Sequence, residues 1–384
     1  MERYYKFGYE LFGPFLYGFV RWLKNELIQK DYDKVFFFSR DGYMMKKAFE
    51  LINDTSIHAE YAYFSRNSLR IPLLHNCKDF EDSLKYLSRE RYVTFSKLLG
   101  YYGFDKAESI QIALQSDFKL EDSIAFEHIS YNSIVRHIYE ENRNIINSRS
   151  LEQNNLLKEY MKNLGMSGKT AIVDIGWYGN MQYYLEQFIA VNGIDIHPEG
   201  FYFGIDSANK LATPVNGYLY DNSNMRNRKK ILCFLGGYEK LLQSCEGSSA
   251  GFERIEGGKV TPVLMPYEYD GDEWIIKAVK NWQFGALRFV KKAYKTGLTD
   301  SDRKLTEPLM YFGMKPSLSD TKLFSFFYIN DGKKEYFTAQ KPLLQYRPNE
   351  FIHDFSASLW KTGFMKSVFK IPLPYFFIYK ILKK

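Results

Sequence analysis

Cysteine is scarce in this chain of 384 residues, which has only Cys77, Cys233 and Cys245. Three widely separated thiols can build neither a framework of disulfides nor a zinc site with four cysteine ligands. Such scarcity is typical of proteins that fold in a reducing compartment. We therefore expect a cytoplasmic protein.

Long apolar runs are missing as well. The apolar stretch at residues 11–20 contains Pro14 and Gly18, is bordered by Glu10 and Arg21, and precedes no small-residue cleavage site. It therefore does not have the form of a signal peptide. No window reaches the roughly 18 apolar residues that a membrane-spanning helix needs. We expect a soluble or peripheral protein.

Several catalytic motifs are also absent. The sequence has no P-loop and no His-Glu-x-x-His, and its six histidines never fall at the close spacing of metal ligands. One Gly-x-Ser-x-Gly match, at residues 247–251, leaves a predicted helix and enters a predicted strand, whereas a nucleophile elbow requires the reverse order. These absences argue against zinc hydrolases and hydrolases with a Ser-His-Asp triad.

Aromatic side chains are abundant, because 31 Tyr, 32 Phe and 5 Trp make up 18% of the chain. They serve hydrophobic cores, sugar-binding platforms and membrane interfaces equally well. The chain is 45% hydrophobic and carries 52 basic against 45 acidic residues, a formal net charge of +7. This composition is typical of a globular protein with a large core, and we expect no nucleic-acid partner.

Buried strands are predicted at residues 35–38, 60–64, 170–173 and 200–204, with a candidate edge strand at 217–220. Predicted helices at 15–28, 43–52 and 181–191 alternate with them, and Asp206, Ser207 and Asn209 mark a loop after the strand at 200–204. This alternation predicts an α/β fold with a Rossmann-like, right-handed parallel sheet. Its ligand site should lie beyond the carboxyl ends of the strands.

The remaining sequence is mainly helical. Residues 79–165 are expected to form a helical insertion or cap, 252–255 and 259–263 a β-hairpin, and 274–296 a helix. We expect an α/β domain at residues 1–260 and a mainly helical C-terminal region at 261–384. Tyr and Trp side chains of the insertion and of the part after residue 260 could stack on sugar rings.

The loop after the strand at 35–38 contains Ser39, Arg40, Asp41, Gly42 and Tyr43. Arginine binds phosphate through two hydrogen bonds, the first amides of a helix favour anions, and a carboxylate can hold Mg²⁺ directly or through water. The loop therefore suits a phosphate and metal site. In the alternative interpretation, Asp41 caps the following helix and Arg40 pairs with it.

A second candidate loop follows the strand at 170–173. It combines a carboxylate, two glycines, two aromatic residues and two amide side chains: Asp174, Gly176, Gly179, Trp177, Tyr178, Asn180 and Gln182. Glycines let the backbone fold around a phosphate, and an acidic residue at a strand end can face a sugar diol or a metal-bound water. Alternatively, the glycines are ordinary turn residues and Trp177 belongs to the core.

Two further sets of polar residues are candidates. Ser65 and Arg66, with Arg70, follow the strand at 60–64 and could add charge to the same rim, although exposed arginines are often simply solvated. Glu246 follows the polar stretch 238–240 beside Gly247, which suits a general base near a cleft. The alternative for Glu246 is a solvated residue at the end of a helix.

Four segments carry a family resemblance: GPFLYGF at 13–19, VFFFSRDGY at 35–43, YFSRNSLR at 63–70 and VDIGWYGNMQ at 173–182. Together they resemble the glycan phosphoribosyltransferases of bacterial polysaccharide clusters, a region that usually follows a haloacid-dehalogenase-type phosphatase domain. A weaker likeness extends to about residue 251. The family transfers 5-phosphoribosyl from 5-phosphoribosyl 1-diphosphate (PRPP) to a growing glycan, and the phosphatase then removes the 5-phosphate to leave ribofuranose.

The resemblance implies a fold related to phosphoribosyltransferases and a role in O-antigen or capsule synthesis, with an acceptor that we expect to be lipid-linked. It implies that residues 39–43 hold the diphosphate and Mg²⁺, with Asp41 as the metal ligand. Asp174 and residues 176–180 would then hold the ribose 5-phosphate. Asp41, Asp174 and Glu246 are the expected catalytic residues.

The chain departs from ordinary phosphoribosyltransferases in one respect. Their paired acids followed by Thr-Gly are missing, because Asp174 is single and Trp177 and Tyr178 replace small residues. The nucleophile motif of the phosphatase is matched only at residues 31–35, before a strand instead of after it, so we expect a separate phosphatase. The alternatives are a phosphatase itself and a scaffold of polysaccharide assembly that binds glycan without catalysis.

The last segment, residues 361–384, contains six lysines and no acidic residue among many apolar and aromatic ones. Pro372 and Pro374 divide it into two pieces that are too short to span a bilayer. Such a segment suits an interfacial anchor near anionic lipids on the inner face of the cytoplasmic membrane. The alternative is a helix packed on the core of the protein with its lysines in water.

Overall fold

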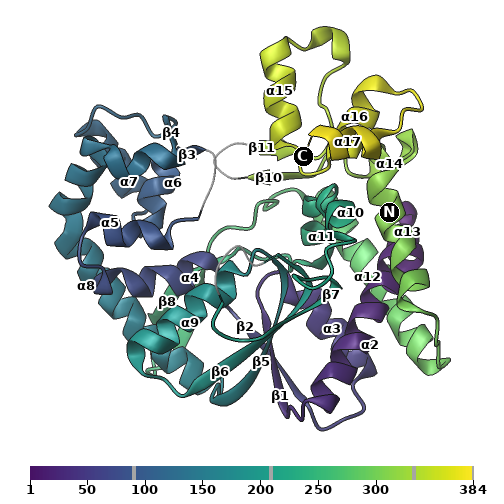
Figure 1. The fold of residues 1–384 in the computed structure, drawn as a ribbon, viewed down its shortest axis with the longest axis horizontal. Helices are drawn as coiled ribbons and strands as arrows, with labels where there is room; N and C mark the ends of the chain where they lie inside the picture. The colour runs from purple at the N-terminus through teal and green to yellow at the C-terminus, as the bar shows by residue number, and fades with distance from the viewer. Residues whose placement is uncertain (89–91, 207–210, 331–333, 383–384) are drawn as a thin grey trace.

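The computed structural model describes residues 1–88, 92–206, 211–330 and 334–382. At its centre lies an all-parallel sheet of five strands in the order β2-β1-β5-β6-β7 (Figure 1). The strands are β1 (Lys34–Phe38), β2 (His58–Ala62), β5 (Gly168–Trp177), β6 (Ile196–Ile205) and β7 (Val215–Tyr220). The expected α/β fold with a parallel sheet is therefore confirmed, including the edge strand β7.

Helices cover both faces of this sheet. Val35 and Phe37 of β1 pack in one hydrophobic cluster with α2 (Gly13–Gln29), α3 (Gly42–Ile52) and α12 (Glu273–Lys295). Phe36 and Phe38 point to the other face, where the cluster includes residues of α8 (Ser133–Asn163) and α9 (Asn180–Asn192). Because both faces are covered, β1 is apolar at nearly every position, as is typical of central parallel strands.

The strand order places a topological switch point between β1 and β5. From β1 the chain moves outward to β2 on one side, and it then returns to build β5, β6 and β7 on the other side. The connections after β1 and after β5 therefore run in opposite directions and leave a crevice beyond the carboxyl ends of these two strands. In open α/β sheets this crevice is the usual ligand site.

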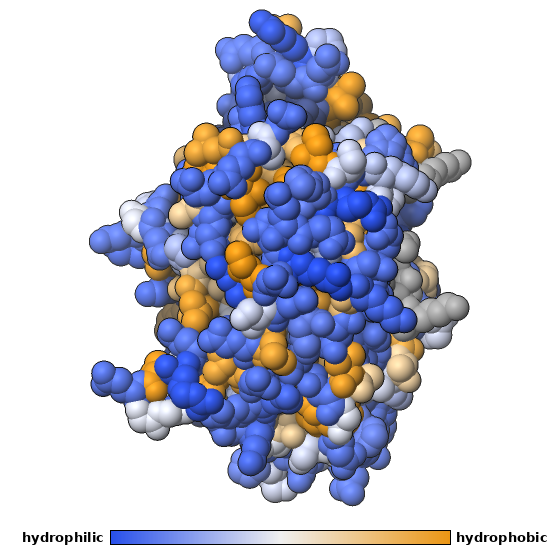
Figure 2. Space-filling model, turned by 90° about the vertical axis from the view of Figure 1, so that its left-hand side faces the viewer, coloured by the Kyte–Doolittle hydropathy of each residue, from blue (hydrophilic) through white to orange (hydrophobic). Residues whose placement is uncertain are grey.

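The helical character predicted for residues 79–165 is confirmed. The segment contains α5 (Phe80–Ser83), α6 (Phe95–Tyr101), α7 (Lys106–Leu114) and α8, and it stands at the left of Figure 1. It also contains an antiparallel pair of short strands, β3 (Tyr92–Thr94) and β4 (Ser123–Ala125), which we did not predict because strands of three residues show no alternation. Hydrophilic side chains cover most of the face seen from this side (Figure 2).

The expected hairpin is formed by β8 (Ser249–Arg254) and β9 (Val260–Leu264), and the expected helix at 274–296 is α12. Short helices connect the sheet to this part: α4 (Arg66–Arg70), α10 (Arg228–Leu232) and α11 (Leu235–Leu242). Beyond α12 lie α13 (Asp302–Met314), α14 (Leu318–Leu323), β10 (Tyr328–Asn330), β11 (Lys334–Tyr336), α15 (Pro348–Ala357), α16 (Lys361–Phe369) and α17 (Tyr375–Leu382).

One hydrophobic cluster joins the first residues of the chain to its later helices. Tyr4, in α1 (Glu2–Phe7), packs against Trp282 of α12 with ring centroids 6.0 Å apart, and Trp282 stacks on Phe324 at 5.9 Å. The same cluster includes Val35 of the sheet and Tyr379 of α17. Its members come from both sides of the boundary that we expect at residue 260.

Three strands differ in length or position from their predictions. β2 begins and ends two residues before the predicted 60–64, and β6 is longer than the predicted 200–204. β5 continues past residue 173 because it pairs with β6 as far as Trp177 opposite Ile205. Of the expected loop after β6, Ser207 and Asn209 lie outside the described residues.

The last segment is divided at its two prolines, as predicted. α16 ends at Phe369 and α17 begins at Tyr375, so Pro372 and Pro374 lie between them. Among the described helices, none is both long enough and apolar enough to cross a membrane. Of the six lysines of this segment, Lys383 and Lys384 lie outside the described residues.

Candidate functional site

Three acidic side chains lie close enough to interact electrostatically near the carboxyl ends of β1 and β5. Asp41 follows β1, Asp174 lies in β5, and Glu239 comes from α11. Their negative charges act on one another, because Glu239 and Asp174 both raise the pKa of Asp41, and Glu239 raises that of Asp174. The structure thus brings two sequence-predicted acids together with one that we had not selected.

Burial is the main reason why these carboxyl groups are hard to ionise. It raises the pKa of Asp41 well above its ordinary value, and the two neighbouring carboxylates add to this effect. Burial raises the pKa of Asp174 to about 6, against backbone hydrogen bonds from Ile175 and Gly176. The pKa of Glu239 is raised for the same reason. The cluster can therefore hold a proton at a pH at which isolated carboxylates are ionised.

Asp174 does not lie in a loop after the strand, and our prediction was wrong on this point. It pairs with Tyr202 inside the β5–β6 ladder, and the ladder continues through Gly176 opposite Gly204. The glycines that indicated a loop instead distort the end of the strand, since Gly176 has a φ of +101°. This irregular strand end lets the Ile175 and Gly176 amides reach the Asp174 carboxylate.

Gly176 is required by its surroundings as well as by its backbone. A Cβ at this position would lie 2.4 Å from the carbonyl oxygen of Gly204. Gly179, with a φ of +70°, is the residue before α9.

Trp177 is buried in the core, and its Nε1 donates a hydrogen bond to Glu239 at 3.0 Å. Trp177 therefore packs in the core, as in the alternative interpretation, and its ring nitrogen also orients a site carboxylate.

A buried ion-pair network lies next to the acid cluster, since the charges of Arg40 and Lys240 act on both Asp41 and Glu239. Glu268, in the loop before α12, accepts hydrogen bonds from Arg40 Nη1 at 2.5 Å, from Gln243 Nε2 at 3.1 Å and from Lys240 Nζ. Burial alone would raise the pKa of Glu268, but the charges of Lys240 and Arg40 lower it to about 2. Glu268 is therefore ionised and fixes the Arg40 side chain.

The alternative in which Asp41 caps α3 and Arg40 pairs with it does not hold. The Asp41 side chain makes no capping hydrogen bond to α3, and the ion-pair partner of Arg40 is Glu268. Arg40 Nη1 also donates to the Glu246 carbonyl at 3.2 Å. Asp41 is thus placed for a role other than helix capping.

The other residues of this first loop are held by the sheet. Ser39 Oγ donates to the Phe64 carbonyl at 3.1 Å. Gly42 begins α3, where a Cβ would lie 2.9 Å from the Phe37 backbone. Tyr43 is half-buried, with its ring centroid 6.3 Å from that of Tyr61.

The residues after β2 divide into structural and site-facing ones. Ser65 caps α4, since its Oγ accepts from the Ser68 amide at 3.0 Å and donates to the Ser249 carbonyl at 2.6 Å. Arg66 is exposed, and its charge acts on both Asp174 and Glu239. Arg70 is buried over the Tyr101 ring at 4.2 Å. Of these three, Arg66 is the cation that faces the acid cluster.

Glu246 lies beside the Arg40 loop, and its carboxylate is not simply solvated. It accepts hydrogen bonds from Tyr61 at 3.1 Å and from Tyr63 at 3.5 Å. α11 ends at Leu242, so Glu246 is not the cap of that helix. It lies at the β2 side of the site, whereas Asp174 lies at the β5 side.

The residues at the start of α9 are placed differently from one another. Tyr178 is exposed, and Asn180 is the first residue of the helix. Gln182 is fully buried: it accepts from Tyr202 at 2.5 Å and donates to Thr213 at 2.7 Å. Gln182 therefore holds the α9 helix to the segment before β7, and its amide is already occupied.

We had not selected Glu239, Lys240 or Glu268. Glu239 and Lys240 are adjacent charged residues in the otherwise apolar helix α11, a signal that could have been used. Glu268 lies 228 positions after Arg40, and no local pattern connects the two.

Within the described ranges, no group of three or more His, Cys, Asp and Glu side chains has the arrangement of a metal site. A Mg²⁺ ion does not require such a group, because it is commonly held by one or two carboxylates together with substrate phosphates and water. Asp41 and Asp174 offer the oxygen ligands that Mg²⁺ prefers. The negative charge of Asp174 also raises the pKa of Asp41. The positive charge of a bound divalent cation would oppose this effect.

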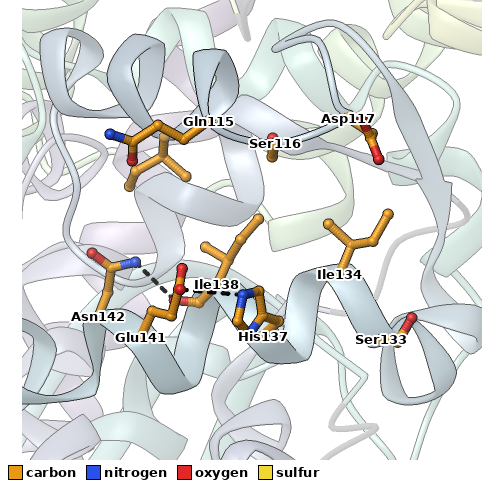
Figure 3. A pocket seen from close by; sticks show the side chains of 10 residues that line it. Gln115, Ser116, Asp117, Ser133, Ile134, His137, Ile138, Glu141 and Asn142 are labelled. Carbon is orange, nitrogen blue, oxygen red and sulfur yellow. Dashed lines mark hydrogen bonds and ion pairs between the residues drawn. The ribbon is translucent and has the colours of Figure 1, made fainter.

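A cavity of about 600 Å³ lies within the helical insertion (Figure 3). Its lining is mainly polar and comes from the end of α7 and the start of α8, and it includes His137 and Glu141, whose side chains pair at 3.2 Å. None of the acid cluster lines it, nor does a Tyr or Trp ring. The sugar-stacking aromatics that we expected in the insertion are therefore not found in this cavity.

Comparison of the sequence with protein-family models and with curated proteins finds no match.

Proposed function

We propose that this chain transfers 5-phosphoribosyl from PRPP to a glycan acceptor during surface polysaccharide synthesis, on a Rossmann-like sheet related to that of phosphoribosyltransferases. The observation that carries the proposal is the acid cluster of Asp41, Asp174 and Glu239 at the switch point between β1 and β5. Ligands of open α/β sheets bind at this point, and two of the four family-like segments contribute Asp41 and Asp174 to it.

The cluster suits the charge that develops in this reaction. The bond between ribose C1 and the diphosphate oxygen breaks, its electron pair leaves with diphosphate, and positive charge develops on the sugar ring. An acceptor hydroxyl then forms the new bond to C1. Fixed carboxylates in a site with little water stabilise such a cation strongly, because their charge is oriented before the reaction.

Cations at the rim suit the phosphate groups of the donor. The Arg40 guanidinium donates from Nη1 both to Glu268 and to the Glu246 carbonyl, so its position is set before a ligand arrives. Arg66 lies where its charge reaches Asp174 and Glu239. A preoriented arginine loses little conformational entropy when it binds a phosphate.

Mg²⁺ fits this donor set, and Asp41 with Asp174 would hold it. When bound, it would supply positive charge that neutralises the diphosphate. Without this cation, the negative carboxylates would repel the negative diphosphate. Glu239 is held by Trp177 at 3.0 Å and is better placed to orient the sugar than to move toward a metal.

The acceptor side is expected near β2. Glu246 is the candidate base that takes the proton of the acceptor hydroxyl, and the Tyr61 and Tyr63 hydroxyls hold its carboxylate. The Tyr43, Tyr61 and Tyr63 rings lie together there, and aromatic rings are common sugar platforms. A separate phosphatase would remove the 5-phosphate after transfer.

Incubation of the full chain with Mg²⁺, PRPP and lipid-linked glycan acceptors tests the proposal by release of diphosphate and by 5-phosphoribosyl on the glycan. We expect Asp41→Asn to lower the rate by about 100-fold or more, because it removes a carboxylate that would hold Mg²⁺. Asp33→Asn is the matched control, because Asp33 precedes β1 at the opposite edge of the sheet.

Two results would contradict the proposal. Glycan binding without diphosphate release from any acceptor would favour the scaffold. Hydrolysis of a phosphate monoester that Asp33→Asn abolishes would favour a phosphatase.

A further inference from the structure

Beside the candidate site lies a strongly basic pocket to which no role has been given. Its volume is about 480 Å³. Its lining comes from the end of β6, from the start of α10 and the turn before it, and from α17: Asp206, Met225, Arg226, Arg228, Lys229, Lys230, Phe376 and Lys380. The residues that line this basic pocket thus include five cations and one carboxylate, and apolar atoms supply most of its surface.

The single acid neutralises only one of these cations. Asp206 pairs with Arg228 at 2.6 Å. Lys230 donates a hydrogen bond to the neutral Asn227 side chain at 2.9 Å, and Lys380 lies 5.5 Å from the centroid of the Phe376 ring. Within the described parts of the chain, Arg228 is the only lining cation that forms an ion pair. The basic pocket thus carries a positive charge that suits an anionic ligand.

The helix that forms one wall of the basic pocket has an apolar outer face. Tyr375 and Tyr379 of α17 are buried against the protein, as helical spacing requires. Phe376 and Lys380 form the next stripe and line the basic pocket. Phe377 and Ile381 follow on the solvent side, where they are 57% and 52% exposed.

More apolar side chains extend this face. Ile371 and Leu373, in the segment before α17, are exposed, and so is Leu382. A helix packed on a soluble protein normally turns polar residues to water, whereas this helix is apolar on its outer side as well. We call the exposed set Ile371, Leu373, Phe377, Ile381 and Leu382 the apolar face.

We propose that the basic pocket and the apolar face together dock the protein on an anionic lipid bilayer, with phosphate headgroups in the basic pocket and the apolar face in the interface. Cations next to exposed apolar side chains are the combination that binds such a surface. Charge complementarity favours lipid over a protein partner, because residues 361–382 contain no acid that would be repelled by the headgroups. A small soluble anion would fill the basic pocket but would leave the apolar face in water.

The docking surface lies at the same edge of the sheet as the acid cluster. Asp206 directly follows β6, and its amide donates to the Trp177 carbonyl at 2.8 Å. If the proposed function holds, a lipid-linked acceptor would then meet the site from the membrane. The binding test itself does not depend on that function, so either proposal can fail alone.

Co-sedimentation of the full chain with vesicles tests the docking. We expect binding to phosphatidylcholine vesicles that contain 30% phosphatidylglycerol, weak binding to pure phosphatidylcholine, and loss of binding in high salt. Lys229→Glu with Lys230→Glu should weaken binding by about tenfold or more, since each basic residue near an anionic surface contributes about fivefold. Phe377→Ser with Ile381→Ser should weaken it at every salt concentration.

Matched variants on α12 control for charge and exposure. Lys291→Glu with Lys295→Glu reverses two exposed lysines, and Phe284→Ser changes a phenylalanine with the same 57% exposure as Phe377. Both should bind as the unchanged protein does. All variants alter surface residues, and their thermal unfolding checks that they are folded.

Equal vesicle binding by the basic-pocket variants and their controls would overturn the proposal. So would the absence of binding to anionic vesicles, or binding that inorganic diphosphate abolishes while the Phe377→Ser, Ile381→Ser variant binds normally. The last result would assign the basic pocket to a soluble phosphate ligand.

Discussion

At the scale of single residues, Asp174 connects stability to function. Its pKa is about 6 in the folded protein, whereas an unfolded chain has an aspartate pKa of about 3.9. At this residue the folded state therefore binds more protons than the unfolded state between these values, so the contribution of Asp174 to the free energy of unfolding falls as pH rises from about 4 to 6. Above this range, ionisation of the buried Asp174 carboxyl lowers the free energy of unfolding by about 3 kcal/mol.

Asp174→Asn should remove the contribution of Asp174 to this pH dependence. We expect the variant to be as stable as the unchanged protein or more stable at pH 7.5, by up to about 3 kcal/mol, while it loses transfer activity. Denaturant unfolding between pH 4 and 8 measures this. Asp195→Asn, which changes an 88% exposed carboxylate, should keep the original profile. A profile for Asp174→Asn that falls as steeply as the original would show that Asp174 is not the group responsible.

The Glu268 carboxylate is the counter-ion of two cations in the buried network. Glu268→Gln leaves Arg40 and the almost fully buried Lys240 without their counter-ion. An uncompensated buried charge is costly, so we expect a loss of about 3 kcal/mol in the free energy of unfolding and weaker binding of PRPP. Urea unfolding and donor titration measure the two effects.

Glu273→Gln is the control for Glu268→Gln, because its pair with Lys277 is 86% exposed at the glutamate and should contribute less than about 0.5 kcal/mol. Equal stability of the two variants would mean that the buried network does not fix Arg40.

The sequence could identify Asp41 and Asp174 because each lies near the end of an apolar run that predicts a buried strand. It could not identify Glu268, whose role depends on a contact with Arg40 across 228 positions. Ser65 and Gln182 have the polar side chains of ligand-binding residues, but the fold uses them to cap α4 and to hold α9. Polar residues at strand ends thus indicate a site without showing which of them serve the fold.

At the scale of elements, the end of β5 decides where Asp174 lies. Gly176→Ala would place a Cβ 2.4 Å from the Gly204 carbonyl oxygen at a φ of +101°. We expect a loss of about 3 kcal/mol or more, from backbone strain and from the clash, together with reduced activity. Denaturant unfolding and the transfer assay measure this.

Gly258→Ala separates these two causes. Gly258 has a φ of +81°, and a Cβ there would meet nothing within 4 Å. It should cost only about 1–2 kcal/mol, the strain of a left-handed residue. If both alanine variants lose the same stability, contact with β6 has no part in setting the end of β5.

Most elements could be predicted, because hydrophobic period and turn residues are local signals. β1, α3, α9, the hairpin of β8 and β9, and α12 follow them closely. The exceptions depend on pairing. β5 runs past Asp174 because β6 offers it partners as far as Ile205, and β3 and β4 are strands only because they pair with each other.

At the scale of the whole molecule, the strand order turns separate loops into one site. The segments after β1 and within β5 are about 130 positions apart in the sequence, yet they meet at the switch point of the sheet. α11 and the loop before α12 then close the site with Glu239, Lys240 and Glu268. The site therefore combines residues of the central sheet with residues from later parts of the chain.

The central claim is that this acid cluster holds PRPP together with Mg²⁺, and calorimetric titration with PRPP tests it without an acceptor. We predict binding that requires Mg²⁺, that is lost in Asp41→Asn, and that is unchanged in Asp33→Asn. Binding of equal strength with a chelator present and in Asp41→Asn, or no binding by the unchanged protein at all, would contradict the claim.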